Sequence, residues 1–120
     1  MEITKIHDIS VLHFFGEVTF LEIDRIERVL ESLKNTNHNK VILNLADADH
    51  VHYQVIKKLA DEASKMRSIN GDIKIVSANQ ETKEVMRFVG ADQYLDDYAN
   101  ISECILSFLK QHGGDELYCQ

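Results

Sequence analysis

The sequence predicts a small α/β domain with a mixed, mostly parallel sheet of four to five strands and four helices. Short runs rich in β-branched and aromatic residues alternate with segments whose apolar residues recur every three or four positions. This order is expected of parallel strands joined by helical crossovers. The run "VILNL" at 41–45 is nearly continuous in apolar residues, which is typical of a central strand covered on both faces.

The first half of the chain predicts two strands and a helix. Residues 3–6 alternate weakly and suit an edge strand, whereas "SVLHFFGEV" at 10–18 is a stronger strand. Thr19 and Glu22 have the spacing of a capping box, so we expect a helix that begins there and ends near Asn35. The apolar stripe of this helix consists of Ile23, Ile26, Val29, Leu30 and Leu33.

The second half predicts a helix, a strand, a short helix, a short strand or turn, and a last helix. Asn70 and Gly71 supply a stop for the first of these helices, and "DIKIVSA" at 72–78 is the next strand. Asn79 has the position of a cap for the short helix, and Asn100 that of a cap for the last one. The second helix carries the apolar residues Ile56, Leu59, Ala60, Ala63, Met66 and Ile69, and a face expected to be solvated with Lys57, Lys58, Asp61, Glu62 and Lys65.

Length and charge restrict the possible partners. We expect one domain over 1–110 and a flexible tail over 111–120, released by Gly113 and Gly114. The net charge of −7 disfavours nucleic acid and anionic membranes, since both need a basic face, and no apolar run has the length of a membrane helix. Cys104 and Cys119 lack metal or redox spacing, so we expect free thiols in a cytoplasmic protein without a cofactor.

The stretch "DADHVHYQ" at 47–54 holds most of the chemistry-bearing residues. It follows the central strand and precedes a helix, where α/β domains often place their sites. Asp47, Asp49, His50 and His52 offer ligands for a divalent metal, although the spacing fixes no third ligand. The same histidines could also change charge between about pH 5 and 8 and act as a sensor.

Two further interpretations of this stretch are catalysis and protein contact. A histidine beside carboxylates suits acid–base chemistry, but the sequence has no recognisable nucleophile elbow and no glycine-rich phosphate loop. We therefore expect no enzymatic activity. Val51 and Tyr53 place apolar and aromatic surface at the junction, and tyrosine is enriched at interface hot spots. The alternative is that Val51 points into the core and Tyr53 caps it.

Three segments carry a resemblance to a known family. They are "FFGEV" at 14–18, "VILNL" at 41–45 and "NGDIKIVSANQETKEVMRFVGADQYL" at 70–95. In this order they resemble the STAS domain of bacterial anti-sigma-factor antagonists, over about residues 3–110. The resemblance implies the α/β fold predicted above and a role in signalling and transcription regulation through partner switching.

The resemblance also implies a phosphoacceptor position, and here the sequence departs from the family. Family members carry Asp-Ser-(Ser or Thr)-Gly after the central strand, and a partner kinase that doubles as the anti-sigma factor phosphorylates the serine. Alignment of "VILNL" places these positions on His52, Tyr53, Gln54 and Val55, so none is retained and Tyr53 holds the acceptor position. Because tyrosine carries its hydroxyl further out on a rigid ring, we expect the usual serine switch to be missing.

The sequence therefore predicts a non-enzymatic protein-interaction module that docks a partner through the loop and helix after the central strand. The residues expected to make contact are Val51, His52, Tyr53, Gln54 and Lys57. The resemblance implies a protein partner, either an ATPase of the serine-kinase and anti-sigma type or a scaffold of related STAS domains, and a homodimer stays open. The alternative is a metal or small-ligand domain that uses Asp47, Asp49, His50 and His52.

Overall fold

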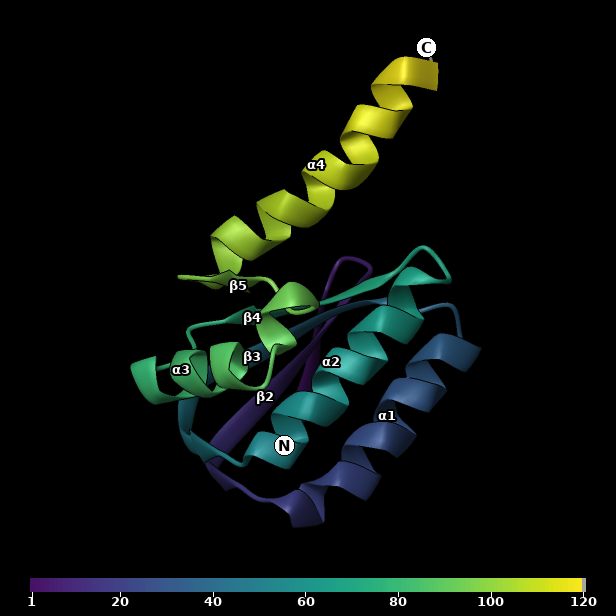
Figure 1. Cartoon of the computed structure of the whole chain (residues 1–120). Helices are drawn as coiled ribbons and strands as arrows, with labels where there is room; N and C mark the ends of the chain where they lie inside the picture. The colour runs from purple at the N-terminus through teal and green to yellow at the C-terminus, as the bar shows by residue number, and fades with distance from the viewer. Residues whose placement is uncertain (120) are drawn as a thin grey trace.

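The structure is a computed structural model that describes the backbone of residues 1–119 and the side chains of residues 1–110. The predicted order of strands and helices is confirmed (Figure 1). The elements are β1 (Glu2–Ile6), β2 (Ile9–Val18), the 3-10 helix η1 (Phe20–Glu22), α1 (Ile23–Asn35), β3 (Lys40–Val51), α2 (Tyr53–Arg67), β4 (Asp72–Val76), α3 (Gln80–Phe88), the 3-10 helix η2 (Ala91–Gln93), β5 (Asp97–Tyr98) and α4 (Ile101–Cys119).

The five strands form one mixed sheet in the order β1-β2-β3-β4-β5. β1 and β2 form an antiparallel hairpin, and every other neighbouring pair is parallel. The mostly parallel α/β fold predicted from the sequence is therefore confirmed. Since the carboxyl ends of β2, β3 and β4 lie at one edge of the sheet, the segments that follow these strands are brought together there.

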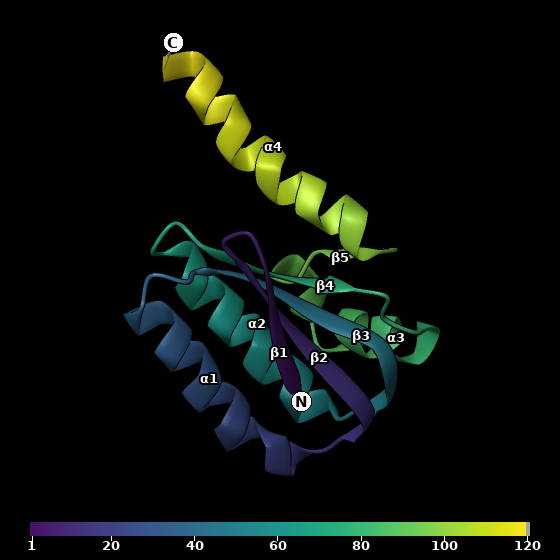
Figure 2. The ribbon, with the colours of Figure 1, turned by 180° about the vertical axis from the view of Figure 1, so that it is seen from behind.

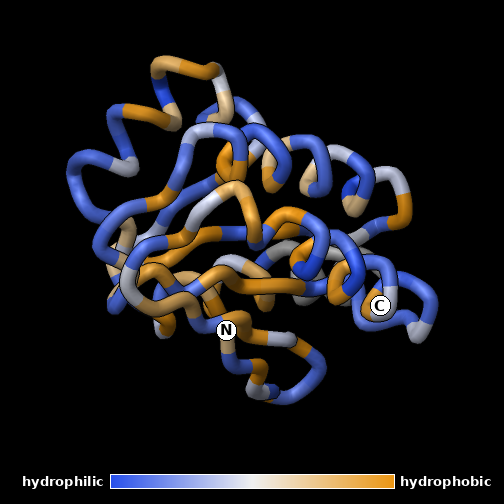
Figure 3. The backbone as a smooth tube through the Cα atoms, turned by 90° about the horizontal axis from the view of Figure 1, so that it is seen from below, coloured by the Kyte–Doolittle hydropathy of each residue, from blue (hydrophilic) through white to orange (hydrophobic). Residues whose placement is uncertain are grey.

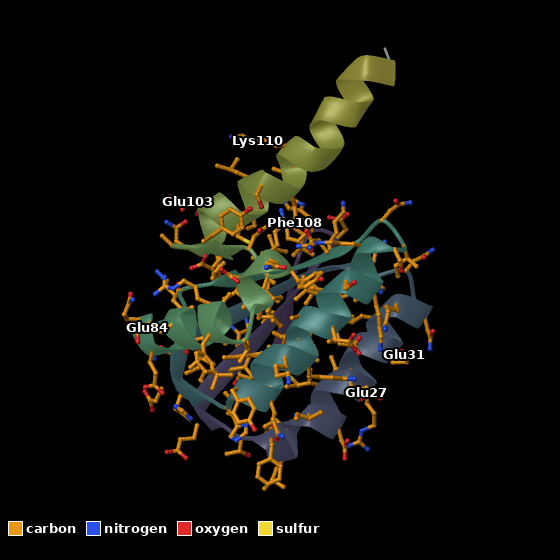
Figure 4. All side chains as sticks on the ribbon, viewed as in Figure 1. Glu27, Glu31, Glu84, Glu103, Phe108 and Lys110 are labelled. Carbon is orange, nitrogen blue, oxygen red and sulfur yellow. The ribbon has the colours of Figure 1, made fainter. Side chains whose placement is uncertain are left out.

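Helices cover both faces of the sheet. Figure 1 shows α1, α2 and α3 on one face, and Figure 2 shows the opposite side, where α4 packs against the β4 and β5 end. The larger core lies under α1 to α3, and α4 closes a smaller core that contains Ile42 and Phe108. Phe108 points from α4 toward the sheet (Figure 4).

The central strand has buried side chains on both faces. Val41 and Leu43 belong to the larger core and Ile42 to the smaller one, all with no exposed surface. This two-sided burial explains why the strand is nearly continuous in apolar residues. In Figure 3 the hydrophobic segments gather between the helices and the sheet, while the outer turns of the helices are hydrophilic.

Two of the three helix caps expected from the sequence are present. Asn79 Oδ1 accepts a hydrogen bond from the backbone N–H of Thr82 at 2.8 Å, and Asn100 Oδ1 accepts one from Glu103 at 2.9 Å. The prediction of a capping box at Thr19 is wrong, because Thr19 Oγ1 accepts a hydrogen bond from the N–H of Leu21 at 3.3 Å. Thr19 is therefore the N-cap of the 3-10 helix η1. The main helix α1 begins only after this turn.

The predicted helix stop lies in the turn between α2 and β4, where Asn70 and Gly71 have different roles. Asn70 has the left-handed conformation, with φ of 63°. A Cβ added to Gly71 would lie 2.2 Å from the carbonyl oxygen of Asn39, so glycine is needed here for close approach of two backbones. Ile69 lies beyond the end of α2 and is 44% exposed, which corrects its placement on the apolar stripe.

The seam between α1 and α2 contains a buried carboxylate. Glu62 is 2% exposed, and its oxygens lie 3.1 Å from Lys34 Nζ, 3.2 Å from Lys58 Nζ and 3.6 Å from Lys65 Nζ. Burial alone would raise the pKa of Glu62, but the hydrogen bonds and charges of Lys34 and Lys58 outweigh it and lower the pKa. The expectation that this whole face of α2 is solvated is therefore wrong at Glu62.

The last helix includes the glycine pair. The backbone of α4 stays helical across Gly113 and Gly114 to Cys119, and residue 120 lies outside the described residues. Flexibility of the tail over 111–120 stays a prediction. Cys104 is a free thiol, as expected, and burial raises its pKa to about 12, which keeps it protonated and unreactive. Over residues 1–119, no helix is long and apolar enough to cross a membrane.

Candidate functional site

The stretch 47–54 is mostly strand. β3 continues through it to Val51 and stays paired with β2, with register shifts between His13 and Phe15 and between Gly16 and Glu17. Only His52 separates the strand from α2, and its N–H donates to the carbonyl of Val18 at 2.9 Å. The expected loop is thus a single residue, held rigidly at the carboxyl edge of the sheet.

His52 is the N-cap of α2. Its backbone is extended, and its Nδ1 accepts a hydrogen bond from the N–H of Gln54 at 3.1 Å. A histidine in this role satisfies one of the backbone donors that a helix leaves free at its first turn. The start of α2 is therefore capped by a side chain of the chain itself.

Three aromatic rings meet at this cap. The His52 ring stacks on Tyr53 with centroids 4.7 Å apart, and its other neighbour is Phe20 of η1, edge-on at 5.8 Å. Tyr53 is 49% exposed and Phe20 is 54% exposed. The packing fixes the rings in place while half of each apolar surface faces solvent, which suits contact with another molecule.

The predicted contact residues separate into two groups. Tyr53, Gln54 and Lys57 are exposed and His52 is half-buried between its aromatic neighbours. Val51 is 3% exposed and lies in the larger core, so it supports the site from beneath and cannot present its side chain to a partner. This corrects its assignment to the contact surface.

The four residues suggested for metal binding are not brought together. Among the residues that the structure describes, no group of three or more histidine, cysteine, aspartate or glutamate side chains is placed to hold a metal ion. His50 Nδ1 lies 2.5 Å from Glu81 Oε1 at the start of α3, whereas His52 faces the rings of Phe20 and Tyr53. The two histidines therefore have separate partners.

Sequence reasoning missed the apolar surroundings of Tyr53. Phe20 and Leu21 of η1 are 54% and 77% exposed, and Phe88 at the end of α3 is 92% exposed. A surface cavity of about 470 Å³ lies between the start of α2 and α3, lined by Tyr53, Glu81, Glu84, Val85, Phe88 and Val89. The sequence did contain one indication of this surface, because Phe20, Leu21 and Phe88 fall outside every predicted core stripe.

The sequence itself identifies the family. A profile of the STAS domain matches residues 1–104, most of the chain. The chain belongs to the STAS domain family. This confirms the resemblance inferred from the strand and turn motifs. Among curated protein sequences, none matches this STAS domain significantly.

Solved structures share the fold of this STAS domain at low sequence identity. A candidate anti-sigma factor antagonist from Thermotoga maritima superposes with a TM-score of 0.80 at 20% identity, covering 88% of this chain and 92% of that one. An anti-sigma factor antagonist from Mycobacterium paratuberculosis gives 0.76 at 15%, covering 88% and 90%. The anti-sigma factor antagonist SpoIIAA of Bacillus, unphosphorylated, gives 0.75 at 14%, covering 94% and 96%.

Proposed function

We propose that this STAS domain is a non-enzymatic signalling module that binds a protein partner through the start of α2. The single observation that carries the proposal is Tyr53, which is half exposed at the first turn of α2 while its ring is held by His52. Gln54 and Lys57 continue this exposed surface along the helix. We define His52, Tyr53, Gln54 and Lys57 as the α2 docking surface.

The proposed surface does not depend on a phosphate. In a serine-switched domain, a phosphate at a helix N-terminus gains from free backbone donors and the helix dipole. Here His52 already accepts from the N–H of Gln54, and the N–H of Val55 donates to the carbonyl of His52 at 3.0 Å. These contacts support a surface that binds its partner constitutively, with regulation by protein level or by a different modification.

Val55 supports the same interpretation. It holds the position of the family's glycine, has no exposed surface and packs in the larger core. A glycine there would remove this buried side chain and loosen the first turn of α2. The departure from the family motif is therefore built into the packing of the domain as well as its surface.

The proposed partner is an ATPase of the serine-kinase and anti-sigma type, or a scaffold of related STAS domains. Membership of the STAS family, and the shared fold with solved anti-sigma factor antagonists, support both. A partner of either kind would be a protein, which agrees with the exposed aromatic surface and the net charge of −7.

Affinity purification of the tagged chain from its native cell, with mass spectrometry, tests the proposal. We expect an ATPase or a STAS-domain protein that is lost with Y53A and retained with L109S, a control at an exposed leucine of α4. The same spectra show whether Tyr53 carries a phosphate. Recovery of neither partner class, or a partner that Y53A leaves bound, would refute the α2 docking surface.

A further inference from the structure

Phe88 has the largest exposed fraction, 92%, among the exposed large apolar side chains of residues 1–110. Its helix, α3, buries Met86 in the core and leaves Val85 and Val89 half-buried. One exposed phenylalanine is ordinary on a protein surface. Phe88, however, lies beside other apolar groups that α2 and α3 bring together.

The cavity between α2 and α3 joins these groups into one concave surface. Its side chains comprise two aromatic rings, Tyr53 and Phe88, two valines, Val85 and Val89, and two carboxylates, Glu81 and Glu84. A smaller cavity of about 270 Å³ shares Val89 and continues between α2 and η2 as far as Tyr94. The volume of the first cavity, about 470 Å³, is enough for a large apolar side chain of a partner.

The start of α3, which forms one wall of this cavity, is tied to β3. Asn79 caps α3 through Thr82 and also donates from Nδ2 to the carbonyl of Asp49 at 3.0 Å. The pair between His50 and Glu81 ties the first turn of α3 to the end of β3. A preformed cavity lowers the ordering cost of binding.

Charge is divided between the two sides of α3. Glu81 and Glu84 line the cavity, and Glu84 lies exposed on α3 (Figure 4). Lys83 and Arg87 instead line a different cavity with Asp97, and Lys83 Nζ lies 3.8 Å from an oxygen of Asp97. The apolar cavity is therefore bordered by acidic side chains on the α3 side.

We propose that the α2–α3 cavity is the specificity-determining half of the docking site, and that it takes a large apolar side chain of the protein partner flanked by lysine or arginine. This inference rests on the proposed function and names the chemistry of the partner's contacting segment. The apolar side chain would fill the space between Tyr53, Val85 and Phe88. The flanking basic groups would pair with Glu84, while Glu81 keeps its pair with His50 and adds to the acidic border, and this charge would speed association at low salt.

Two synthetic peptides provide the probe. Both form one amphipathic helix with phenylalanine and leucine on one face, and the flanking positions are lysine in the first peptide and glutamate in the second. Titration into the ¹⁵N-labelled full chain is followed by NMR. We expect the lysine peptide to shift the amides of Tyr53, Val85 and Phe88, and to bind at least about tenfold more tightly than the glutamate peptide. Its affinity should fall as ionic strength rises.

Two variants and a control locate the binding. F88S and E84K should each weaken the lysine peptide about tenfold, whereas L109S, which removes a similar exposed side chain from α4, should leave its affinity unchanged. Because Phe88 and Glu84 are exposed, both variants should keep the melting temperature of the parent chain. Absence of peptide binding, equal binding of both peptides, or shifts confined to α4 would each overturn the inference.

The same variants separate this inference from the proposed function. If the partner captured through Tyr53 still binds F88S and E84K at full strength, the α2 docking surface stands and the α2–α3 cavity has no role in specificity. If that partner is lost with Y53A, F88S and E84K but kept with L109S, both proposals are supported.

Discussion

The first turn and the second half of α2 place polar and aromatic groups in opposite environments. At the first turn, Tyr53 is 49% exposed, and its neighbour His52 caps the helix. Two turns later, Glu62 is 2% exposed and lies within 3.6 Å of three lysine ammonium groups. One helix thus presents an aromatic surface at its start and encloses a charge further along.

Because of this difference, we expect Tyr53 to matter for binding and Glu62 to matter for stability. Little of the core depends on the half of the Tyr53 ring that faces solvent, so that surface is available to a partner at no cost to folding. Glu62 is the reverse case, because its charge is stabilised only by the lysines that α1 and α2 bring to it. Substitutions at Tyr53 and at Glu62 should therefore affect different measurements, partner binding at the first and stability at the second.

The largest effect is expected from E62A. Removal of the carboxylate takes away the shared partner of Lys34 and Lys58, each of which keeps one exposed glutamate partner, and we expect a loss of about 2 kcal/mol of unfolding free energy. Urea denaturation measures it. D61A is the matched control, since Asp61 pairs with Lys65 at an exposed position, and it should change stability by less than about 0.5 kcal/mol. Equal effects of the two variants would contradict the role given to Glu62.

A smaller loss of stability is expected from substitution of His52, the N-cap of α2. H52A removes the acceptor for the Gln54 N–H and should cost about 1 kcal/mol of stability, whereas H52N keeps a capping oxygen and should recover most of it. Partner binding should fall with both variants, because both remove the ring that stacks on Tyr53. If H52N restored binding together with stability, the ring would have no part in docking.

The sequence predicted what local pattern determines. The run at 41–45 has the composition of a strand buried on both faces, and Asn79 and Asn100 act within three residues of their own positions. The alternation of strand and helix patterns predicted the mostly parallel sheet for the same reason, since helical crossovers leave few ways to arrange the strands.

The sequence did not predict features that long-range contacts decide. Glu62 has the same spacing to lysines as an exposed ion pair, and only the approach of α1 buries it. Residues 47–51 resemble a polar loop, but pairing with β2 extends the strand through them and turns Val51 inward. The cavity at Phe88 needs α2 and α3 to meet, which no periodicity in either segment reveals.

The pH dependence of stability should also distinguish Glu62 from exposed carboxylates, with an effect smaller than that of H52A. Since the pKa of Glu62 is lowered on folding, its contribution is present above about pH 4.5, the ordinary value, and is lost as the pH falls through the lower folded pKa. Burial raises the pKa of Asp72 and acts in the opposite direction. We therefore expect the stability difference between the parent chain and E62Q, from urea midpoints, to shrink in acid, while the difference between the parent and D61N is small at neutral pH and changes little as the pH falls.

The smallest effect is expected from zinc. His50 pairs with Glu81 and His52 caps α2, and among the described residues no group of three or more histidine, cysteine, aspartate or glutamate side chains is placed to hold a metal ion, so Asp47, Asp49, His50 and His52 would have to move to surround one. Calorimetric titration of the chain with zinc should give heats of dilution alone, and the H52A variant should give the same trace. A stoichiometric heat that disappears in H52A would restore the metal site as a function of this end of the sheet, and would mean that the aromatic cluster rearranges to bind the ion.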